Sequence, residues 1–134
     1  MATIRWEEPV AVPAAQAWAL LRRVDRAHEL FAPVLVAGSM EGDVRTVTFA
    51  NGLVVQERIV TVDDQAQRIA YTVVGEMFEH HSASMQILPV DDAMCRFVWI
   101  SDFLPDERAE TVRPLVEQGS RAFAKNVEDR KIRG

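Results

Sequence analysis

Three side chains in this sequence are of the types needed for proton transfer in an apolar setting: Glu57, Tyr71 and His81. A histidine changes charge close to neutral pH, and a carboxylate taken out of water can serve as a base or acid there. A tyrosine hydroxyl can donate a hydrogen bond to a ligand carbonyl. Together these groups suit the removal of a proton next to a carbonyl group and the stabilisation of the enolate that forms.

Two of the three histidines, His80 and His81, are neighbours in the segment FEHHSASMQIL. Neighbouring side chains on a strand point to opposite faces, so one metal ion cannot readily take both rings. The sequence contains neither H-x-H nor H-E-x-x-H, the spacings that bring two histidines to one metal. We therefore expect no metal. His81 is interpreted as an acid/base or hydrogen-bond donor, or alternatively as a partly exposed residue at the mouth of the sheet.

The strands that would position these residues follow one another through the middle of the chain. A first strand is expected at residues 4–10 and two short helices at 13–24 and 25–30. Six strands are then expected at 34–40, 44–50, 53–62, 68–74, 81–90 and 94–103. The turn between the second and third of these contains Asn51-Gly52, a strong hairpin signal because both residues tolerate positive φ. Hairpin connections predict an antiparallel sheet.

One long helix is expected after the last strand, at residues 105–128. Val116, Gly119, Phe123 and Val127 recur every three or four residues along one face of it, and it is the only element long enough to cover the apolar face of the sheet. Pro114 lies inside this span. The sequence thus predicts a single α+β domain over residues 1–134. Its curved antiparallel sheet of about seven strands surrounds the C-terminal helix, with two short helices after strand one.

Alternation along the strands decides which side chains face the cavity expected between sheet and helix. The inner face is mostly apolar, and a few polar groups join it, as in small-molecule sites. The predicted acid/base or donor residues are Glu57, His81 and Tyr71, and the predicted ligand contacts are Arg45, Val55, Met85, Phe97, Trp99, Ser101, Gly119 and Phe123.

Several of these residues also have a structural interpretation. Glu57 could instead form an ion pair with Arg45 or bond to Tyr71, and Tyr71 could be a core residue with one polar end. Phe97 and Trp99 could stack on a flat ligand or belong to the core. Gly119 either leaves room for a ligand or allows close helix–sheet packing. Cys95, the single cysteine, is expected to be a buried, unreactive thiol.

The overall composition excludes several classes of function. The net charge is -5, which argues against a nucleic-acid partner. No phosphate-binding or dinucleotide motif occurs, so we expect no cofactor. The N-terminus lacks a signal-peptide core, and no apolar run has the roughly 18 residues required of a membrane span. A cytoplasmic protein is the simplest expectation.

Three segments carry a resemblance to a known family. These are VPAAQAWALL, NGLVVQERIVTVDDQAQRIAYTVV and CRFVWISDFLPD. In element order and in spaced single residues the chain resembles the polyketide cyclase/dehydrase branch of the START-like, Bet v 1-like (SRPBCC) superfamily, from about residue 4 to 127. The resemblance implies a helix-grip fold and a deep cavity for small hydrophobic or aromatic ligands.

Three functions are compatible with this pattern. In the first, a cyclase or dehydratase holds a carbonyl compound in one conformer, uses Glu57 or His81 as acid/base, and stabilises the enolate with Tyr71, Arg45 or Ser101. In the second, the cavity binds a lipid or small molecule and nothing reacts. In the third, the chain is a regulatory or partner-binding module. Outward-facing apolar residues would then form a homodimer contact, at Val98 and Ile100.

Overall fold

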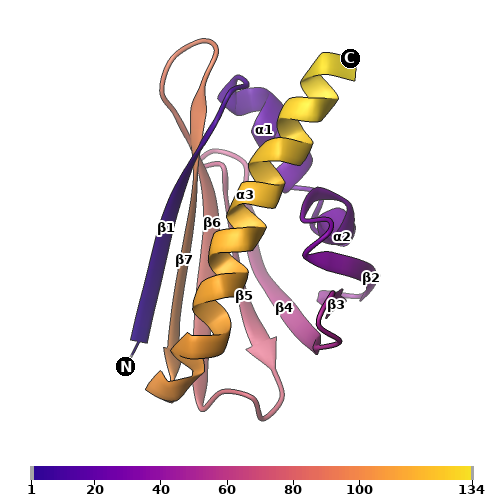
Figure 1. Cartoon of the computed structure of the whole chain (residues 1–134), viewed down its shortest axis with the longest axis vertical. Coiled ribbons are helices and arrows are strands. Elements are labelled where there is room, and N and C mark those ends of the chain that lie inside the picture. The colour runs from indigo at the N-terminus through magenta and orange to yellow at the C-terminus, as the bar shows by residue number, and fades with distance from the viewer. Residues whose placement is uncertain (1, 134) are drawn as a thin grey trace.

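The computed structural model describes residues 2–133, so positions 1 and 134 of the predicted domain lie outside the described residues. Figure 1 shows a long helix lying along one face of a curved sheet. The elements are β1 (Ala2–Val10), α1 (Ala14–Leu21), η1 (Val24–Arg26), α2 (Ala27–Leu30), β2 (Leu35–Glu41), β3 (Val44–Phe49), β4 (Val54–Asp63), β5 (Arg68–Val74), β6 (His80–Pro89), β7 (Cys95–Leu104), η2 (Asp106–Arg108) and α3 (Ala109–Arg133).

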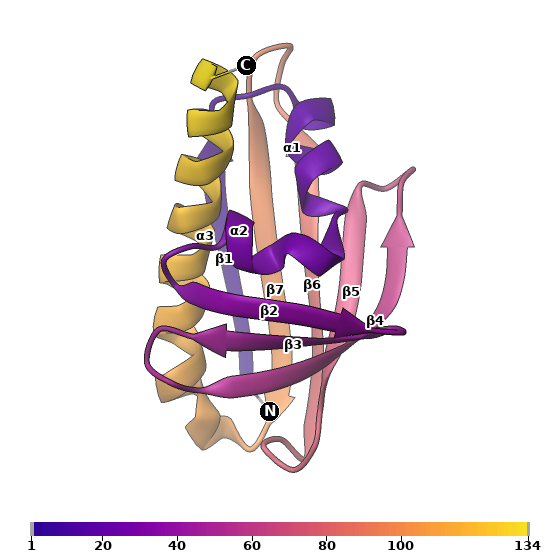
Figure 2. The same ribbon diagram turned by 90° about the vertical axis from the view of Figure 1, so that its right-hand side faces the viewer.

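All seven strands form one antiparallel sheet in the order β1-β7-β6-β5-β4-β3-β2. The predicted α+β helix-grip fold is therefore confirmed. Register shifts interrupt the pairing between Leu35 and Ala37 in β2 and between Ile59 and Thr61 in β4. Such bulges increase the local twist. Figure 2 shows this twist: β2 and β3 run almost across the direction of β6 and β7.

Helix α3 buries the face that its periodicity predicts. Val116, Phe123 and Val127 are fully or almost fully buried, and they follow the three- and four-residue spacing of one helical stripe. Pro114 lies within the helix, one turn after its start at Ala109. Asn126 donates hydrogen bonds of 2.8 Å to the carbonyls of Leu30 and Ala32, which ties the α2 segment to α3.

Aromatic rings fill the space between α3 and the centre of the sheet. Phe123 stacks on Phe97 with ring centroids 4.5 Å apart and on Phe31 at 5.4 Å. Trp99 lies beside Phe31 at 5.7 Å. A second, smaller apolar cluster surrounds Phe103 near the other end of the helix. The two clusters leave space beside Trp99, which packs against both of them.

The outer face of the sheet corrects one expectation. Val98 was expected to be exposed on this face as part of a dimer contact, but it is only 4% exposed. Its register partners are Glu7 on β1 and Gln86 on β6, and the stems of such long side chains can cover a valine between them. Ile100 is partly buried. The patch proposed from sequence is therefore not an open apolar surface.

Among residues 2–133, no helix is long and apolar enough to cross a membrane.

Candidate functional site

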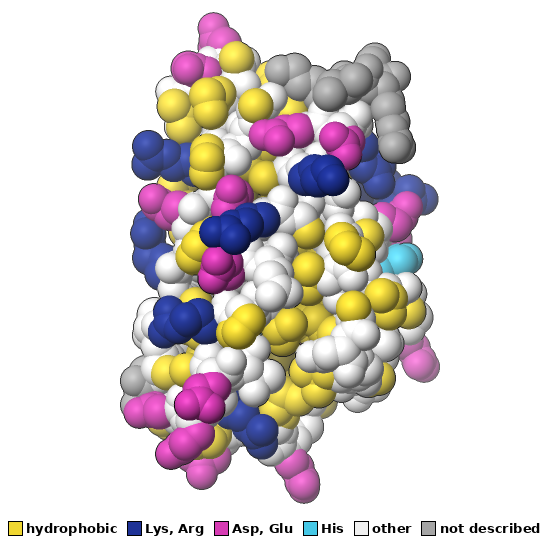
Figure 3. Space-filling model, in the orientation of Figure 1, with side chains coloured by type: hydrophobic (Ala, Val, Ile, Leu, Met, Phe, Trp, Pro, Cys, Tyr) yellow, Lys and Arg dark blue, Asp and Glu magenta, His cyan; other side chains and the backbone are white. Residues whose placement is uncertain are grey.

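A cavity of about 60 Å³ lies between the sheet and the first half of α3. We call it the outer cavity. Figure 3 shows a hollow with hydrophobic side chains between α3 and the β2–β4 part of the sheet. Most of its lining is apolar, and its lining residues are Phe49, Leu53, Val55, Glu57, Tyr71, Val73, Met77, Phe78, His81, Trp99, Ser101, Thr111, Val112, Leu115 and Val116.

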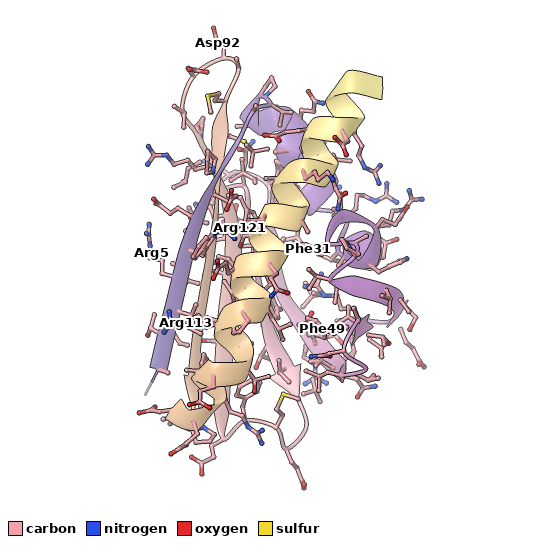
Figure 4. The ribbon with its side chains drawn as sticks, viewed as in Figure 1. Arg5, Phe31, Phe49, Asp92, Arg113 and Arg121 are labelled. Atoms are coloured by element: carbon pink, nitrogen blue, oxygen red, sulfur yellow. The ribbon has the colours of Figure 1, made fainter. Side chains whose placement is uncertain are left out.

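A second space, the inner cavity, has about 30 Å³ and lies toward α2. Its lining residues are Ala27, Phe31, Leu35, Arg45, Val47, Phe49, Glu57, Tyr71, Met85 and Trp99. Four residues line both cavities: Phe49, Glu57, Tyr71 and Trp99. Figure 4 shows Phe31 and Phe49 beside α3, on the side where α2 and β3 come round to meet it. The two spaces are therefore neighbours that share one wall.

A buried ion pair forms part of this shared wall. Arg45 on β3 is directly opposite Glu57 on β4, and its Nε donates to Glu57 Oε1 at 2.8 Å. The two side chains are only 5% and 11% exposed. Arg45 also donates from Nη1 to the Val24 carbonyl at 3.2 Å, and its guanidinium lies 5.2 Å from the Tyr71 ring centroid. The ion pair that the sequence left as one alternative is thus formed, and Glu57 still faces both cavities.

Tyr71 presents a hydroxyl hydrogen to this region. Trp99 donates from Nε1 to the Tyr71 hydroxyl oxygen at 3.1 Å, so that oxygen is the acceptor and its own hydrogen remains to be donated. No acceptor for it occurs among the hydrogen bonds of the described residues. Burial, and secondly the Glu57 carboxylate, raises the pKa of Tyr71 far above its ordinary value. The phenol therefore stays neutral and acts as a hydrogen-bond donor.

His81 lies where β5 and β6 separate. Their pairing ends at Tyr71 opposite Ala83. Beyond that point the Val73 amide donates to Nδ1 of the His81 ring at 3.1 Å, and the Thr72 hydroxyl donates to the His81 carbonyl at 2.6 Å. The side chain of His81 thus takes the place of a backbone partner in the ladder.

This contact fixes the tautomer of the neutral ring. A backbone amide can only donate, so Nδ1 of His81 is the acceptor and the ring proton is on Nε2. Nε2 is 3.5 Å from Ser101 Oγ, and both residues line the outer cavity. Burial, followed by the nearby His80, lowers the pKa of His81 to about 4. At neutral pH the ring is therefore an uncharged donor.

Comparison with known proteins agrees with this architecture. The family described as polyketide cyclase / dehydrase and lipid transport matches residues 1–130. The chain belongs to this family. No curated protein matches the sequence.

Several proteins of known structure share the fold at low sequence identity. A Thermobifida fusca protein solved by NMR is 28% identical, with 95% of this chain and 93% of that chain covered and a TM-score of 0.76. A Streptomyces aromatase/cyclase is 21% identical, with 98% and 94% covered and a TM-score of 0.78. Thalictrum flavum norcoclaurine synthase, in complex with dopamine and hydroxybenzaldehyde, is 17% identical, with 98% and 87% covered and a TM-score of 0.76. At the identities of the last two, the likeness shows the fold alone.

Within this polyketide cyclase / dehydrase fold, the residues named from sequence divide into two groups. The cavity-lining group is Glu57, Tyr71, His81, Arg45, Val55, Met85, Trp99 and Ser101. Phe97 and Phe123 stack on each other in the core and line neither cavity. Gly119 does not line either cavity. A Cβ added at this position would lie only 2.9 Å from Trp99 Cζ3. Its missing side chain allows close helix–sheet packing and does not leave room for a ligand.

Sequence reasoning missed the β5–β6 loop, the early turns of α3, and the α2 segment with Ala27 and Phe31 as parts of the lining. Met77 and Phe78 come from the loop between β5 and β6, and Arg108 Nε donates to the Met77 carbonyl at 3.0 Å. Phe78 lies 4.9 Å from the His81 ring centroid. A loop has no apolar period to identify its inward residues. The early turns of α3 could have been predicted as part of the lining from the apolar spacing that includes Val112.

Proposed function

We propose that the outer cavity binds a small hydrophobic or aromatic carbonyl compound and that Glu57 removes a proton from the carbon next to its carbonyl group. One observation carries the proposal. Two uncharged donors, Tyr71 and His81, and one carboxylate, Glu57, line the same, mostly apolar cavity. That combination matches the charge changes of enolisation, in which negative charge leaves the base and develops on the carbonyl oxygen.

The three side chains have separate roles in this proposal. The carbonyl oxygen accepts hydrogen bonds from the Tyr71 hydroxyl and from His81 Nε2–H. Glu57 takes the proton, and the electron pair of the broken C–H bond moves into the enolate. In a cyclisation, the enolate carbon then forms a bond to a second carbonyl carbon of the same molecule. The protonated Glu57 returns its proton to the new alkoxide, so the carboxylate is restored.

His81 is a donor in this scheme and not the base. Its Nδ1 already accepts the Val73 amide, and its Nε2 carries the ring proton. Of the two acid/base residues named from sequence, Glu57 is therefore the one with a free acceptor position. Ser101, whose hydroxyl lies 3.5 Å from Nε2, lies beside the same donor.

The size of the cavity limits the ligand. A cavity holds a water once about 10–15 Å³ is open to it. The outer cavity of about 60 Å³ has room for several water-sized groups, which limits the ligand to a single ring with short substituents. Drug-sized ligands occupy pockets of about 300–1,000 Å³. A single-ring aromatic ketone is thus the appropriate first probe.

A second candidate function is binding without reaction. It is favoured by the Arg45–Glu57 ion pair, because the Glu57 carboxylate already has a structural partner at 2.8 Å. In that case Glu57, Tyr71 and His81 would only orient the ligand.

Deuterium exchange separates the two candidates. The methyl protons of acetophenone are followed by proton NMR in heavy water with the protein, and binding is measured separately by calorimetry. We expect the protein to accelerate exchange and Glu57→Gln to reduce that acceleration by about 10²–10⁴-fold. Glu79→Gln is the matched control, because Glu79 is exposed on the loop before β6.

Each outcome has a definite meaning. Exchange that Glu57→Gln leaves unchanged would overturn the catalytic role. Binding without accelerated exchange in the unmodified protein would support the binding function. Failure of acetophenone to bind at all would refute the proposed ligand class.

A further inference from the structure

The inner cavity has a chemical character that the proposed reaction does not use. It shares Phe49, Glu57, Tyr71 and Trp99 with the outer cavity, so a substituent on a ligand in the outer cavity would reach it between these four side chains. With about 30 Å³, the inner cavity holds about two or three water-sized groups by the measure that about 10–15 Å³ holds a water. The inner cavity therefore has room for a small substituent but not for a second ring.

The polar side of the inner cavity is formed by both members of the buried ion pair. An arginine has five N–H donors. In Arg45, one is used on Glu57 and one on the Val24 carbonyl. No acceptor for the remaining donors occurs among the hydrogen bonds of the described residues, and Arg45 lines the inner cavity. Glu57 supplies the acceptor, since a carboxylate has about four lone-pair positions and Arg45 occupies one.

The charges of this pair determine which substituent fits. A ligand carboxylate would approach Arg45 but would also lie against the Glu57 carboxylate, and a ligand ammonium would lie against Arg45. Like charges brought together in a buried site repel strongly. A methyl group would leave the remaining donors of Arg45 and the remaining acceptor positions of Glu57 without a partner. A hydroxyl is uncharged, donates one hydrogen bond and accepts another from the same oxygen.

We propose that the inner cavity is a hydroxyl-recognition site, and that the ligand is a single-ring hydroxyaryl carbonyl compound. The carbonyl group lies in the outer cavity and the ring hydroxyl lies between Arg45 and Glu57. This inference rests on the proposed function for the position of the carbonyl group. The hydroxyl and the reacting carbon use different lone pairs of Glu57, so recognition and proton removal do not compete for one acceptor.

A site built to hydrogen-bond a hydroxyl discriminates strongly against an analogue that lacks it, because the buried polar groups are then left unpaired. The experiment compares three probes by calorimetry: acetophenone, para-hydroxyacetophenone and para-methylacetophenone. Methyl and hydroxyl substituents are similar in size. We expect the hydroxyl probe to bind at least about tenfold more tightly than the methyl probe.

A variant that fills the inner cavity supplies the control. Val47 lines only the inner cavity, and Val47→Ile adds one methylene there while keeping a β-branched side chain for β3. The hydroxyl preference should fall to less than about twofold, whereas the affinity for acetophenone should stay within about twofold. Ala27→Val, from α2 on the opposite wall, gives a second test should Val47→Ile fold poorly.

The outcomes distinguish this inference from the proposed function. Equal binding of the hydroxyl and methyl probes, with acetophenone still bound and exchanged, would overturn hydroxyl recognition alone. If both filling variants keep the hydroxyl preference, the hydroxyl binds elsewhere, and hydroxyl recognition by the inner cavity is overturned as well. If none of the three probes binds, the proposed ligand class and the inference that rests on it both fail.

Discussion

Removal of Arg45 should show how much the buried ion pair matters to the folded protein. In Arg45→Met the apolar stem is kept, but Glu57 loses the guanidinium whose Nε lies 2.8 Å from its Oε1. Breaking a pair this deeply buried leaves an uncompensated charge and costs about 3–5 kcal/mol. A domain of ordinary stability has about 5–15 kcal/mol in total. We therefore expect the variant to lose at least about a fifth of its stability.

The exposed pair of Arg58 and Asp43 provides a matched control. Their nearest atoms are 3.6 Å apart, and the side chains are 53% and 66% exposed. Such pairs contribute about 0–1 kcal/mol. Arg58→Met removes the same charge from the next residue along from Glu57. Urea unfolding of the two variants should therefore differ by about 2–5 kcal/mol.

A double-mutant cycle tests the cause of the loss. Glu57→Gln combined with Arg45→Met removes the unpaired charge, so the double variant should be more stable than the sum of the single losses predicts. The coupling should be about 0.5–3 kcal/mol. Equal losses for Arg45→Met and Arg58→Met, or additive losses in the cycle, would refute the argument that Arg45 stabilises a buried Glu57 charge.

Three further predictions concern neighbouring residues. The pKa of His81 falls from 6.5 to about 4 on folding, so the unfolded chain binds more protons than the folded one between these pH values. The stability of the protein should therefore fall as the pH drops from about 6.5 to about 4. Urea titrations at several pH values should show that His81→Gln lacks this part of the acid sensitivity. Gly119→Ala places a Cβ 2.9 Å from the Trp99 ring, and overpacking of about 1–3 kcal/mol should exceed the helix-propensity gain of about 1 kcal/mol; a raised Tm would contradict the close-packing interpretation. Tyr71→Phe removes the acceptor of the Trp99 indole N–H, which should cost about 1–3 kcal/mol and shift that proton in the NMR spectrum; an unshifted indole resonance would count against the hydrogen bond.

Strand alternation predicted the inward side chains correctly because each strand has one buried and one solvated face. Glu57, Tyr71 and Ser101 are buried as expected. Val98 was the exception, since burial on the outer face depends on the side chains of the two adjacent strands. The sequence of β7 alone does not show how long the side chains on the two adjacent strands are.

The pairing of Arg45 with Glu57 depends on the register between β3 and β4, which the sequence alone does not fix to within one residue. A two-residue turn at Asn51-Gly52 would place Arg45 opposite Arg58. The turn is longer, because the amide of Phe49 donates to the Leu53 carbonyl and Thr48 pairs with Val54. That single-residue difference brings opposite charges together where the shorter turn would have opposed two cations.

The role of His81 could not be predicted from its residue type. A histidine at a cavity mouth can be a base, a donor or a rim residue, and the choice depends on what holds Nδ1. In this structure the Val73 amide donates to Nδ1 at 3.1 Å. That amide is free to donate only because β5 and β6 stop pairing at Tyr71 and Ala83. The end of a ladder is a tertiary feature that neither strand's sequence encodes alone.

The buried ion pair is hard to explain by stability alone. Replacing such a pair with apolar residues of similar volume is often neutral or stabilising, so the fold itself does not require Arg45 and Glu57. Both side chains, however, face the inner cavity, and Glu57 also faces the outer one. What apolar replacements could not supply is a wall that donates and accepts hydrogen bonds. An Arg45→Met, Glu57→Leu double variant should therefore fold about as well as the unmodified protein and yet bind para-hydroxyacetophenone no better than the methyl probe. Such a result would separate the structural role of the pair from its role in ligand recognition.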